Sequence, residues 1–291
     1  MLRFSAKRLT YFIFIATVVY LLHEVFDWTR VAIPFGVVST LGGALAIFLA
    51  FRNSSSYDRW WEARKIWGGI VNSSRTWGRQ CTTFMHGADA EFIKTLVYRH
   101  IAWINALRLQ LRLQDSWQEV DPFLSAEEKT WVMERKNKAT QLVQRQGEDL
   151  ATALKAGHIN DFRHQLMDQT LTEFYNLQGK CERIKNTPMP RQYDFFTRVF
   201  VFVFASLLPF GLIDLLDANH IAWMVIPLSV IISFCFSVLE SLGYFNEDPF
   251  ENRIQDTPMT ALCRTIEIDM REQLGETDLP PKLEPVDGFL Y

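Results

Sequence analysis

The stretch that decides the fold is Ser39-Thr-Leu-Gly-Gly-Ala-Leu-Ala-Ile-Phe-Leu-Ala-Phe51, which runs directly into Arg52-Asn-Ser-Ser-Ser-Tyr-Asp-Arg-Trp-Trp61. Its first half carries no charged residue. At helical spacing Gly43, Ile47 and Phe51 recur every four residues and form one stripe. The neighbouring faces hold small residues, which let helices approach closely in a membrane, where packing must supply the attraction: Gly42, Ala44, Ala46 and Ala50.

This stripe has two interpretations. In the first, the segment is an ordinary membrane-spanning helix whose small residues pack against other helices, which is the simpler interpretation on composition alone. In the second, Gly43, Ile47 and Phe51 line the axis of an oligomer, and their stacked rings gate a pore by excluding water from it. The residues that follow the stripe decide between the two.

Apolar and charged residues are segregated along the chain, which is 48% hydrophobic and 22% charged. Four apolar stretches approach the length of about 20 residues that crosses a bilayer core: residues 9–26, 31–51, 195–213 and 221–239. No cleavage site follows the first stretch, so we expect a retained span and no signal peptide. The pattern predicts an all-α integral membrane protein in which four transmembrane helices continue into a cytoplasmic helical bundle.

Basic residues concentrate at one end of the spans. They precede the first span, follow the second and precede the third: Arg3, Lys7, Arg8, Arg52, Arg59, Arg64, Lys65, Arg183, Lys185 and Arg191. The positive-inside rule therefore places both termini and the middle segment in the cytoplasm. The four cysteines show no paired spacing, which indicates neither a disulfide framework nor a zinc site.

In the cytoplasmic lobe, residues 52–194, the segment from Ala88 to Lys185 has helical spacing throughout. The helix of the second span should cover Val31 to Trp61, interrupted at most near Pro34. Ser125 and Glu128 form a capping box that predicts a helix start. Three glycines are expected breaks between helices: Gly147, Gly157 and Gly179.

Charge divides the cytoplasmic part in two. Residues 52–194 hold 21 basic and 17 acidic residues, whereas residues 220–291 hold 12 acidic and four basic ones. The acidic C-terminal segment, residues 240–291, is therefore expected to pack on the basic lobe of its own chain or of a neighbouring subunit. Because this arrangement leaves no uncompensated basic face, we expect no nucleic-acid binding.

Catalytic and cofactor-binding motifs are missing from the sequence, which has no phosphate-binding glycine loop, no nucleophile elbow and no zinc-protease motif. His158, Asp161 and His164 follow one another as on a solvated helix face. We therefore predict no catalytic residue, no metal and no cofactor. The ionisable candidates next to the spans are Asp214 and Glu240, and Glu240 is expected to be paired or functional because of its depth.

The segment Asn186-Thr-Pro-Met-Pro190 precedes the third span. Pro188 and Pro190 fix the backbone on both sides of Met189, so that one side chain is held at a rigid corner. The simpler interpretation of this segment is a helix start.

Four stretches, taken in order, resemble the bestrophin family, in particular its bacterial members. The run from Ala46 to Arg64 is similar to the second transmembrane segment of that family, and the run from Asn186 to Pro190 is similar to the turn before the third. Two more stretches match elements that follow the fourth segment: Glu247-Asp-Pro-Phe250 and Asp278-Leu-Pro-Pro-Lys-Leu-Glu-Pro285. The resemblance covers essentially the whole chain, so we predict that residues 1–291 form one bestrophin-like domain.

The resemblance implies a homopentameric ion channel that assembles around a central pore in the lipid bilayer of the bacterial inner membrane and passively conducts small monovalent ions. By position, the hydrophobic neck of the family falls on Gly43, Ile47 and Phe51, the stripe that the helical spacing also selects. The first ring is glycine here, where relatives have a bulky aliphatic residue. The cytoplasmic aperture falls on Met189, which is more flexible than the branched residue that it replaces.

Animal bestrophins carry a calcium clasp after the fourth segment. Of its acidic ligands, only Asp256 and, by position, Asp248 have counterparts here, and Arg253 stands where a carboxylate belongs. Because a cation at this place repels calcium, the resemblance implies a degenerate clasp and no calcium activation.

The sign of the conducted ion stays open at this point. Eukaryotic bestrophins conduct anions, bacterial relatives are associated with monovalent cations, and the net charge of −3 favours cations if the acidic segment faces the vestibule. The alternative to a channel is a non-conducting membrane scaffold or regulatory subunit whose apolar stripe only packs an oligomer. A transporter is disfavoured, because no pair of broken helices occurs in matching halves.

Overall fold

The structure is a computed structural model that describes residues 2–285, 288 and 290. Over these residues every regular element is a helix, and four helical segments are long and apolar enough to cross a membrane: Ala6–Val25, Thr29–Phe84, Arg191–Asp217 and Ala222–Glu247. The predicted all-α membrane protein with four spans is confirmed. The chain divides into two compact units. Unit 1 holds the residues up to Asp58 together with Pro188–Glu247, and unit 2 holds Arg59–Thr187 together with the residues from Asp248 onward.

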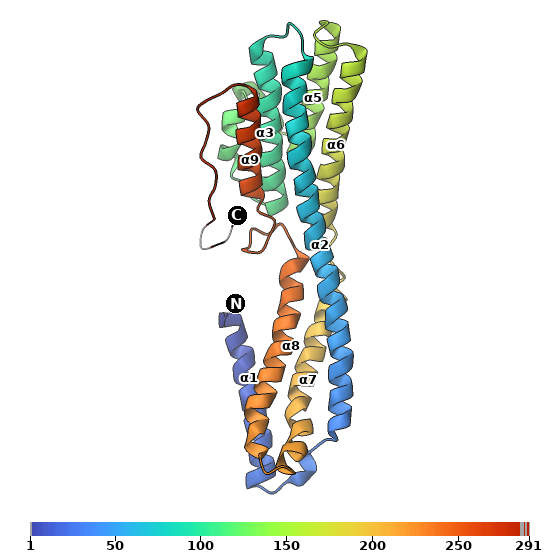
Figure 1. Ribbon diagram of the computed structural model, residues 1–291, viewed down its shortest axis with the longest axis vertical. Helices are drawn as coiled ribbons and strands as arrows, with labels where there is room; N and C mark the ends of the chain where they lie inside the picture. The colour runs from blue at the N-terminus through green and yellow to red at the C-terminus, as the bar shows by residue number, and fades with distance from the viewer. Residues whose placement is uncertain (1, 286–287, 289, 291) are drawn as a thin grey trace. The chain divides into compact units, whose positions relative to one another are not determined.

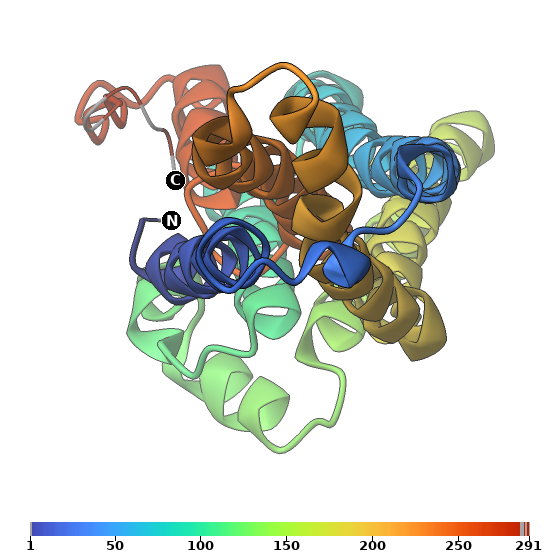
Figure 2. The same ribbon diagram turned by 90° about the horizontal axis from the view of Figure 1, so that it is seen from below.

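Unit 1 is a bundle of four helices: α1 (Leu2–Tyr20), the first part of α2 (Phe35–Phe84), α7 (Arg191–Asp217) and α8 (Val225–Glu247). Three short turns complete it: the π-helical turn η1 (Leu21–Val25) and the 3₁₀ turns η2 (Thr29–Val31) and η5 (Ala222–Met224). α1, α7 and α8 pack against one another (Figures 1 and 2), and α2 contacts α7 through its side chains.

Helix α2 begins directly after Pro34, where the sequence predicts an interruption. A proline ring disfavours helical geometry in the residue before it, which sets this start. The helix then continues beyond the predicted end at Trp61 and stops at Phe84. It continues because an apolar face at helical spacing extends into unit 2, where these residues are buried: Ala63, Ile70 and Trp77.

Glycine lets α2 and α7 approach closely at two points. A Cβ on Gly42 of α2 would stand 2.8 Å from the Phe204 ring, and a Cβ on Gly211 of α7 would stand 2.7 Å from Val38. Both distances are shorter than carbon atoms tolerate, so a glycine is needed at each point. The other small residues that were predicted to pack helices are exposed in the single chain: Ala44, Ala46 and Ala50.

Unit 2 combines the rest of α2 with α3 (Ala90–Arg112), α4 (Ala126–Met133), α5 (Lys138–Lys155), α6 (Asp161–Asn186) and α9 (Met259–Gln273). Two 3₁₀ turns, η3 (Trp117–Glu119) and η4 (Asp121–Phe123), connect α3 to α4. The centre of the core is aromatic, because the buried rings of Trp77 and Trp103 both contact Phe174.

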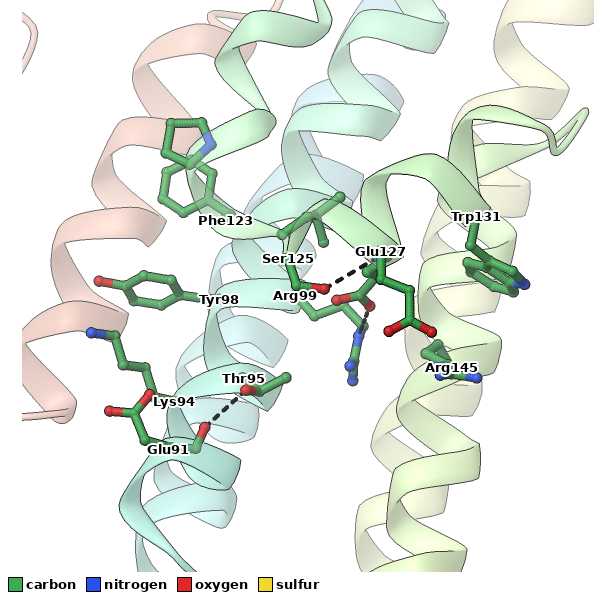
Figure 3. Close-up of a pocket in the computed structure, with 13 residues that line it drawn as sticks. Glu91, Lys94, Thr95, Tyr98, Arg99, Phe123, Ser125, Glu127, Trp131 and Arg145 are labelled. Atoms are coloured by element: carbon green, nitrogen blue, oxygen red, sulfur yellow. Dashed lines mark hydrogen bonds and ion pairs between the residues drawn. The ribbon is translucent and has the colours of Figure 1, made fainter.

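The predicted helix start at Ser125 is confirmed. Its hydroxyl accepts a hydrogen bond of 3.2 Å from the Glu128 N–H, and α4 begins at the next residue. The Glu128 carboxylate is held by the Arg99 guanidinium, which also lies 2.5 Å from Asp149. Ser125 and Arg99 line a pocket of about 500 Å³ whose walls come from α3, α5 and residues 122–131 (Figure 3). These ion pairs join α3, α4 and α5, which gives the pocket wall a structural role.

Of the three predicted glycine breaks, one is confirmed. Gly157 separates α5 from α6 in a left-handed conformation, with φ at 78°. The predictions for Gly147 and Gly179 are wrong, because α5 continues through the first and α6 through the second. A glycine inside a helix costs about 1 kcal/mol relative to alanine. Burial of the apolar faces of these helices, which include Leu150 and Phe174, offsets that cost.

The acidic C-terminal segment packs on its own chain. Helix α9 lies against α3, and Asp269 lies 2.7 Å from Arg75. Glu276 lies 3.8 Å from Lys94 and accepts a hydrogen bond of 2.7 Å from the Tyr98 hydroxyl. These contacts show the arrangement in which the segment packs on the lobe of its own chain.

Arg52 of α2 is buried in unit 1, with 3% of its side chain exposed. Its guanidinium lies 2.8 Å from Asp194 of α7, and it lies 3.7 Å from Glu247 and 4.0 Å from Glu240 of α8. A buried cation that lost these carboxylates would carry the full penalty of its desolvation. The position of Arg52 therefore depends on two other helices.

Glu240 extends this charge network to α1. Its carboxylate, on a side chain that is 2% exposed, lies 2.6 Å from Arg8 of α1 and 3.8 Å from Arg198 of α7. Glu240 was expected to be paired or functional, and the structure confirms that it is paired. Through Arg52, Asp194 and Glu240, the network joins all four helices of unit 1 at the end where α1 and α7 begin.

We expect Arg52→Leu to lower the free energy of unfolding by about 3–5 kcal/mol, because the substitution leaves buried carboxylates without their cation. The measurement is thermal unfolding of the purified protein in detergent. Arg183→Gln is a matched control, since Arg183 forms an exposed ion pair with Glu62 at 2.6 Å and such pairs contribute about 0–1 kcal/mol. If the Arg52→Leu protein unfolds at the same temperature as the control, the network has no stabilising role.

Candidate pore-lining site

Helix α2 presents two different faces in unit 1. The buried face carries residues at steps of three and four: Val38, Gly42, Leu45, Leu49 and Arg52. This face packs on the other helices of the unit, and it ends in the charge network. The residues of the predicted pore stripe lie between these positions, on the other side of the helix.

The predicted neck residues form an exposed face of α2. Ile47 and Phe51 are 62% and 72% exposed, and no atom lies within 4 Å of the position that a Cβ on Gly43 would occupy. In the apolar stretch of the segment that contains α2, 11% of the residues are buried, whereas 50% are buried in the corresponding stretch of α7. A helix face this apolar and this exposed requires lipid or another copy of the chain to cover it.

The chemistry of the exposed stripe changes after Phe51. Ser55 and Asp58 lie four and seven residues further along the helix, and both are exposed. At 3.6 residues per turn they share the face of Ile47 and Phe51. The stripe therefore changes from apolar side chains to a hydroxyl and then to a carboxylate within about two helical turns.

Met189 lies in the turn that leads into α7. The helix begins at Arg191 with Pro190 at its N-cap, so the simpler interpretation of this segment, a helix start, is present. The Ser56 hydroxyl of α2 lies 3.9 Å from the Met189 sulfur in a weak hydrogen bond. Met189 is thus half-buried against α2. Its contact there, Ser56, follows Phe51 by five residues along that helix.

One cavity brings a predicted neck residue and the predicted aperture residue together. Phe51 and Met189 both line this cavity of about 420 Å³. Tyr193 of α7 lines it as well, and its ring stacks on Phe48 with the centroids 5.9 Å apart. Gly43 and Ile47 lie further toward the start of α2 and do not line it.

Of the two residues that match the calcium clasp by position, Asp256 closes a turn. Asp256 is buried, and its carboxylate accepts a hydrogen bond of 3.0 Å from the Arg253 N–H, which closes a turn. Burial raises the pKa of Asp256 above its ordinary value, and the backbone hydrogen bonds partly oppose this shift. Asp248 and Asp256 belong to no group of candidate metal ligands in the described part of the chain.

A group of three possible ligands occurs elsewhere, in unit 1. His23, Glu24 and Asp217 each offer an atom within 4.8 Å of the others, and among residues 2–285, 288 and 290 this is the group that meets that condition. His23 is buried and lies 2.8 Å from Glu24 and 3.4 Å from Asp214. Asp214, the second ionisable candidate from the sequence, is therefore a partner of this histidine.

Sequence reasoning missed two residues of α7 that complete the charge network around Arg52 and Glu240. Asp194 and Arg198 stand in the first turns of α7, and they pair with each other and with the charges of α2 and α8. The available signal was the placement of several ionisable residues at one end of the predicted spans, where such groups tend to pair. That signal gives the cluster but not its pairing, because pairing depends on how the helices are rotated.

Comparisons with known proteins agree with this geometry. Residues 3–272 match the family described as bacterial/fungal bestrophin protein. A voltage-dependent anion channel-forming protein of Mesorhizobium japonicum is 34% identical over 258 residues, which cover 89% of this chain and 79% of that protein. A protein of the same description from Escherichia coli K12 is 32% identical, over 97% of this chain and 90% of its own length.

The fold has a close counterpart among solved structures. The crystal structure of a bacterial bestrophin homologue from Klebsiella pneumoniae superposes with a TM-score of 0.86 at 30% identity, over 94% of this chain and 99% of the homologue. The family match covers most of the sequence, and the structural match covers the same helices. The chain belongs to the bacterial and fungal bestrophin family.

Proposed function

We propose that this chain is an ion channel, a homopentamer whose single pore lies on the symmetry axis. The observation that carries the proposal is the exposed apolar stripe of Gly43, Ile47 and Phe51 on α2. One copy of the chain leaves this stripe uncovered, whereas a ring of copies would turn it toward a common axis. Family membership and the channel-forming description of relatives support a channel and not an enzyme.

In this proposal Ile47 and Phe51 form the narrow part of the neck. Stacked rings of large apolar side chains exclude water when the passage is narrow, and ions cannot cross a dry segment. Gly43 adds no side chain, so its ring is the widest of the three. Met189 forms the second constriction at the cytoplasmic mouth, and its cavity shared with Phe51 supports a location next to the neck.

Two observations bear on the sign of the conducted ion, and they point in opposite directions. The curated relatives are described as anion channel-forming proteins. On this chain the stripe continues into Asp58, and a ring of carboxylates in a pore concentrates monovalent cations. We propose conduction of small monovalent ions in general, and the flux experiment below measures the sign.

The proposal also covers placement in the membrane and the role of the clasp residues. We place the protein in the bacterial inner membrane with both termini on the cytoplasmic side, and we take residues 1–291 as one bestrophin domain. The gathering of Arg8, Arg52 and Arg198 at one end of unit 1 supports this orientation. Activation by calcium is not expected, since Arg253 stands beside Asp256.

Reconstitution of the purified protein in liposomes tests the proposal. We expect a pentamer by native mass measurement in detergent, and a passive flux of ions when sodium and chloride gradients are applied separately. A non-conducting scaffold or regulatory subunit, the alternative function, would give an oligomer of the same size without flux. A monomer at working concentration would exclude a pore on a symmetry axis.

The neck makes a second prediction. Replacing Ile47 and Phe51 together by alanine should widen the apolar rings, keep water in the passage and raise the flux without adding charge. Leu41→Ala is a matched control, because Leu41 is also an exposed apolar residue of α2 but lies off the stripe. Truncation of packed residues can cost about 2–5 kcal/mol, so oligomer size is measured on each variant. Unchanged or lower flux in an intact double variant would count against gating by these rings.

Met189 makes a third prediction. Since a methionine side chain has three rotatable bonds, its ring should constrict less sharply than the neck, and Met189→Ala should change the flux less than the neck variant does. Met189→Glu and Met189→Arg should shift the sodium-to-chloride permeability ratio in opposite directions. Intact pentamers in which both charged variants keep the original ratio would show that Met189 does not line the pore.

A further inference from the structure

A groove of about 510 Å³ runs between α1 and α7 in unit 1, and α8 contributes Ser237 and Glu240 to its lining. Its wall is largely apolar. The rings of Tyr11 on α1 and Phe202 on α7 stack with centroids 4.8 Å apart, and Val199 lies beside them with 36% of its surface exposed. Because both helices are membrane spans, the groove offers an apolar track at the depth of the lipid.

Three cations also line this groove: Lys7, Arg8 and Arg198. Glu240 is the one carboxylate in the lining, and it is almost fully buried below Arg8 and Arg198. Lys7 is exposed, and Arg198 keeps 48% of its side chain exposed. Glu240 therefore matches the inner sides of the two arginines, and Asp194 of α7 also pairs with Arg198. The three cations of the groove still outnumber these two carboxylates, so its accessible rim, which includes the exposed Lys7, carries an excess of positive charge.

We propose that this groove binds an anionic phospholipid, with the headgroup phosphate at Lys7, Arg8 and Arg198 and an acyl chain along Tyr11, Val199 and Phe202. Basic pockets between membrane helices on the cytoplasmic side suit such headgroups, and the rim lies at the end of unit 1 where α1 begins. Free phosphate would leave the apolar wall uncovered. A neighbouring copy would have to bring both an anion and an apolar strip to the same place.

The bound lipid would also act on the neck, a step that rests on the proposed function. The two carboxylate oxygens of Glu240 have different partners. One lies 2.6 Å from Arg8, and the other lies 3.8 Å from Arg198 and 4.0 Å from Arg52. The Nη1 atom of Arg52 is buried and makes no hydrogen bond among the described residues. A phosphate that takes over Arg8 and Arg198 frees Glu240 to accept from Arg52, the residue directly after Phe51.

Lipid titration of the purified oligomer in mixed micelles tests the binding step. We expect phosphatidylglycerol to raise the melting temperature more than phosphatidylcholine does, and inorganic phosphate alone to have no effect. Lys7→Gln should weaken the apparent affinity for phosphatidylglycerol about fivefold, the effect of one basic residue near an anionic lipid.

Val199→Trp should weaken binding of this lipid by filling the apolar track. Arg30→Gln, which removes an exposed cation in the η2 turn between α1 and α2, should leave it unchanged.

Three outcomes would overturn the inference. The two lipids could raise the melting temperature equally, or the Lys7→Gln protein could bind phosphatidylglycerol as well as the Arg30→Gln control does. In the third outcome, Val199→Trp dissociates the oligomer but the protein still binds the lipid. The last result would mean that a second copy covers the groove. Ion flux in liposomes with and without phosphatidylglycerol tests the coupling step. Lipid binding without flux in either composition would refute the channel and leave the lipid site standing.

Discussion

Arg52 can lie buried among membrane helices only because carboxylates from α7 and α8 meet it there. Its contacts with Asp194 and Glu247 fix the rotation of α2 about its own axis, since no other rotation keeps the guanidinium next to both. The same rotation turns Leu45 and Leu49 into unit 1 and leaves Ile47 and Phe51 outside. The exposed stripe is thus a consequence of where one buried charge has to be.

Two adjacent glycines on α2 show how differently the two faces are constrained. Gly42 is required by packing, since a Cβ there would stand 2.8 Å from the Phe204 ring. Gly43 meets nothing within 4 Å, so packing within the chain does not require it. Under the proposed function, Gly43 would widen one level of the stripe in a ring of copies, which leaves Ile47 and Phe51 to define the narrow part.

Much of the fold could be predicted from the sequence, because a membrane requires long apolar helices and the chain has four. The Ser125 cap and the break at Gly157 follow from local chemistry, and both are present. Gly147 and Gly179 show the limit of local rules, since tertiary burial of a helix face outweighs a single glycine. The pairing of Asp194 with Arg52 could not be predicted either, because these residues are 142 positions apart in sequence and their contact depends on the rotations of two helices.

Under the proposed function, the exposed stripe separates two tasks that a channel has to perform. Rings of Ile47 and Phe51 would exclude water, and a dry passage stops a cation and an anion alike, so in this proposal these residues set whether ions pass but not which ions pass. Discrimination by sign requires charge or oriented polar groups, and on this stripe those are Ser55 and Asp58, beyond the neck. Under the proposed function, the opening of the passage and the sign of the conducted ion therefore depend on different turns of α2.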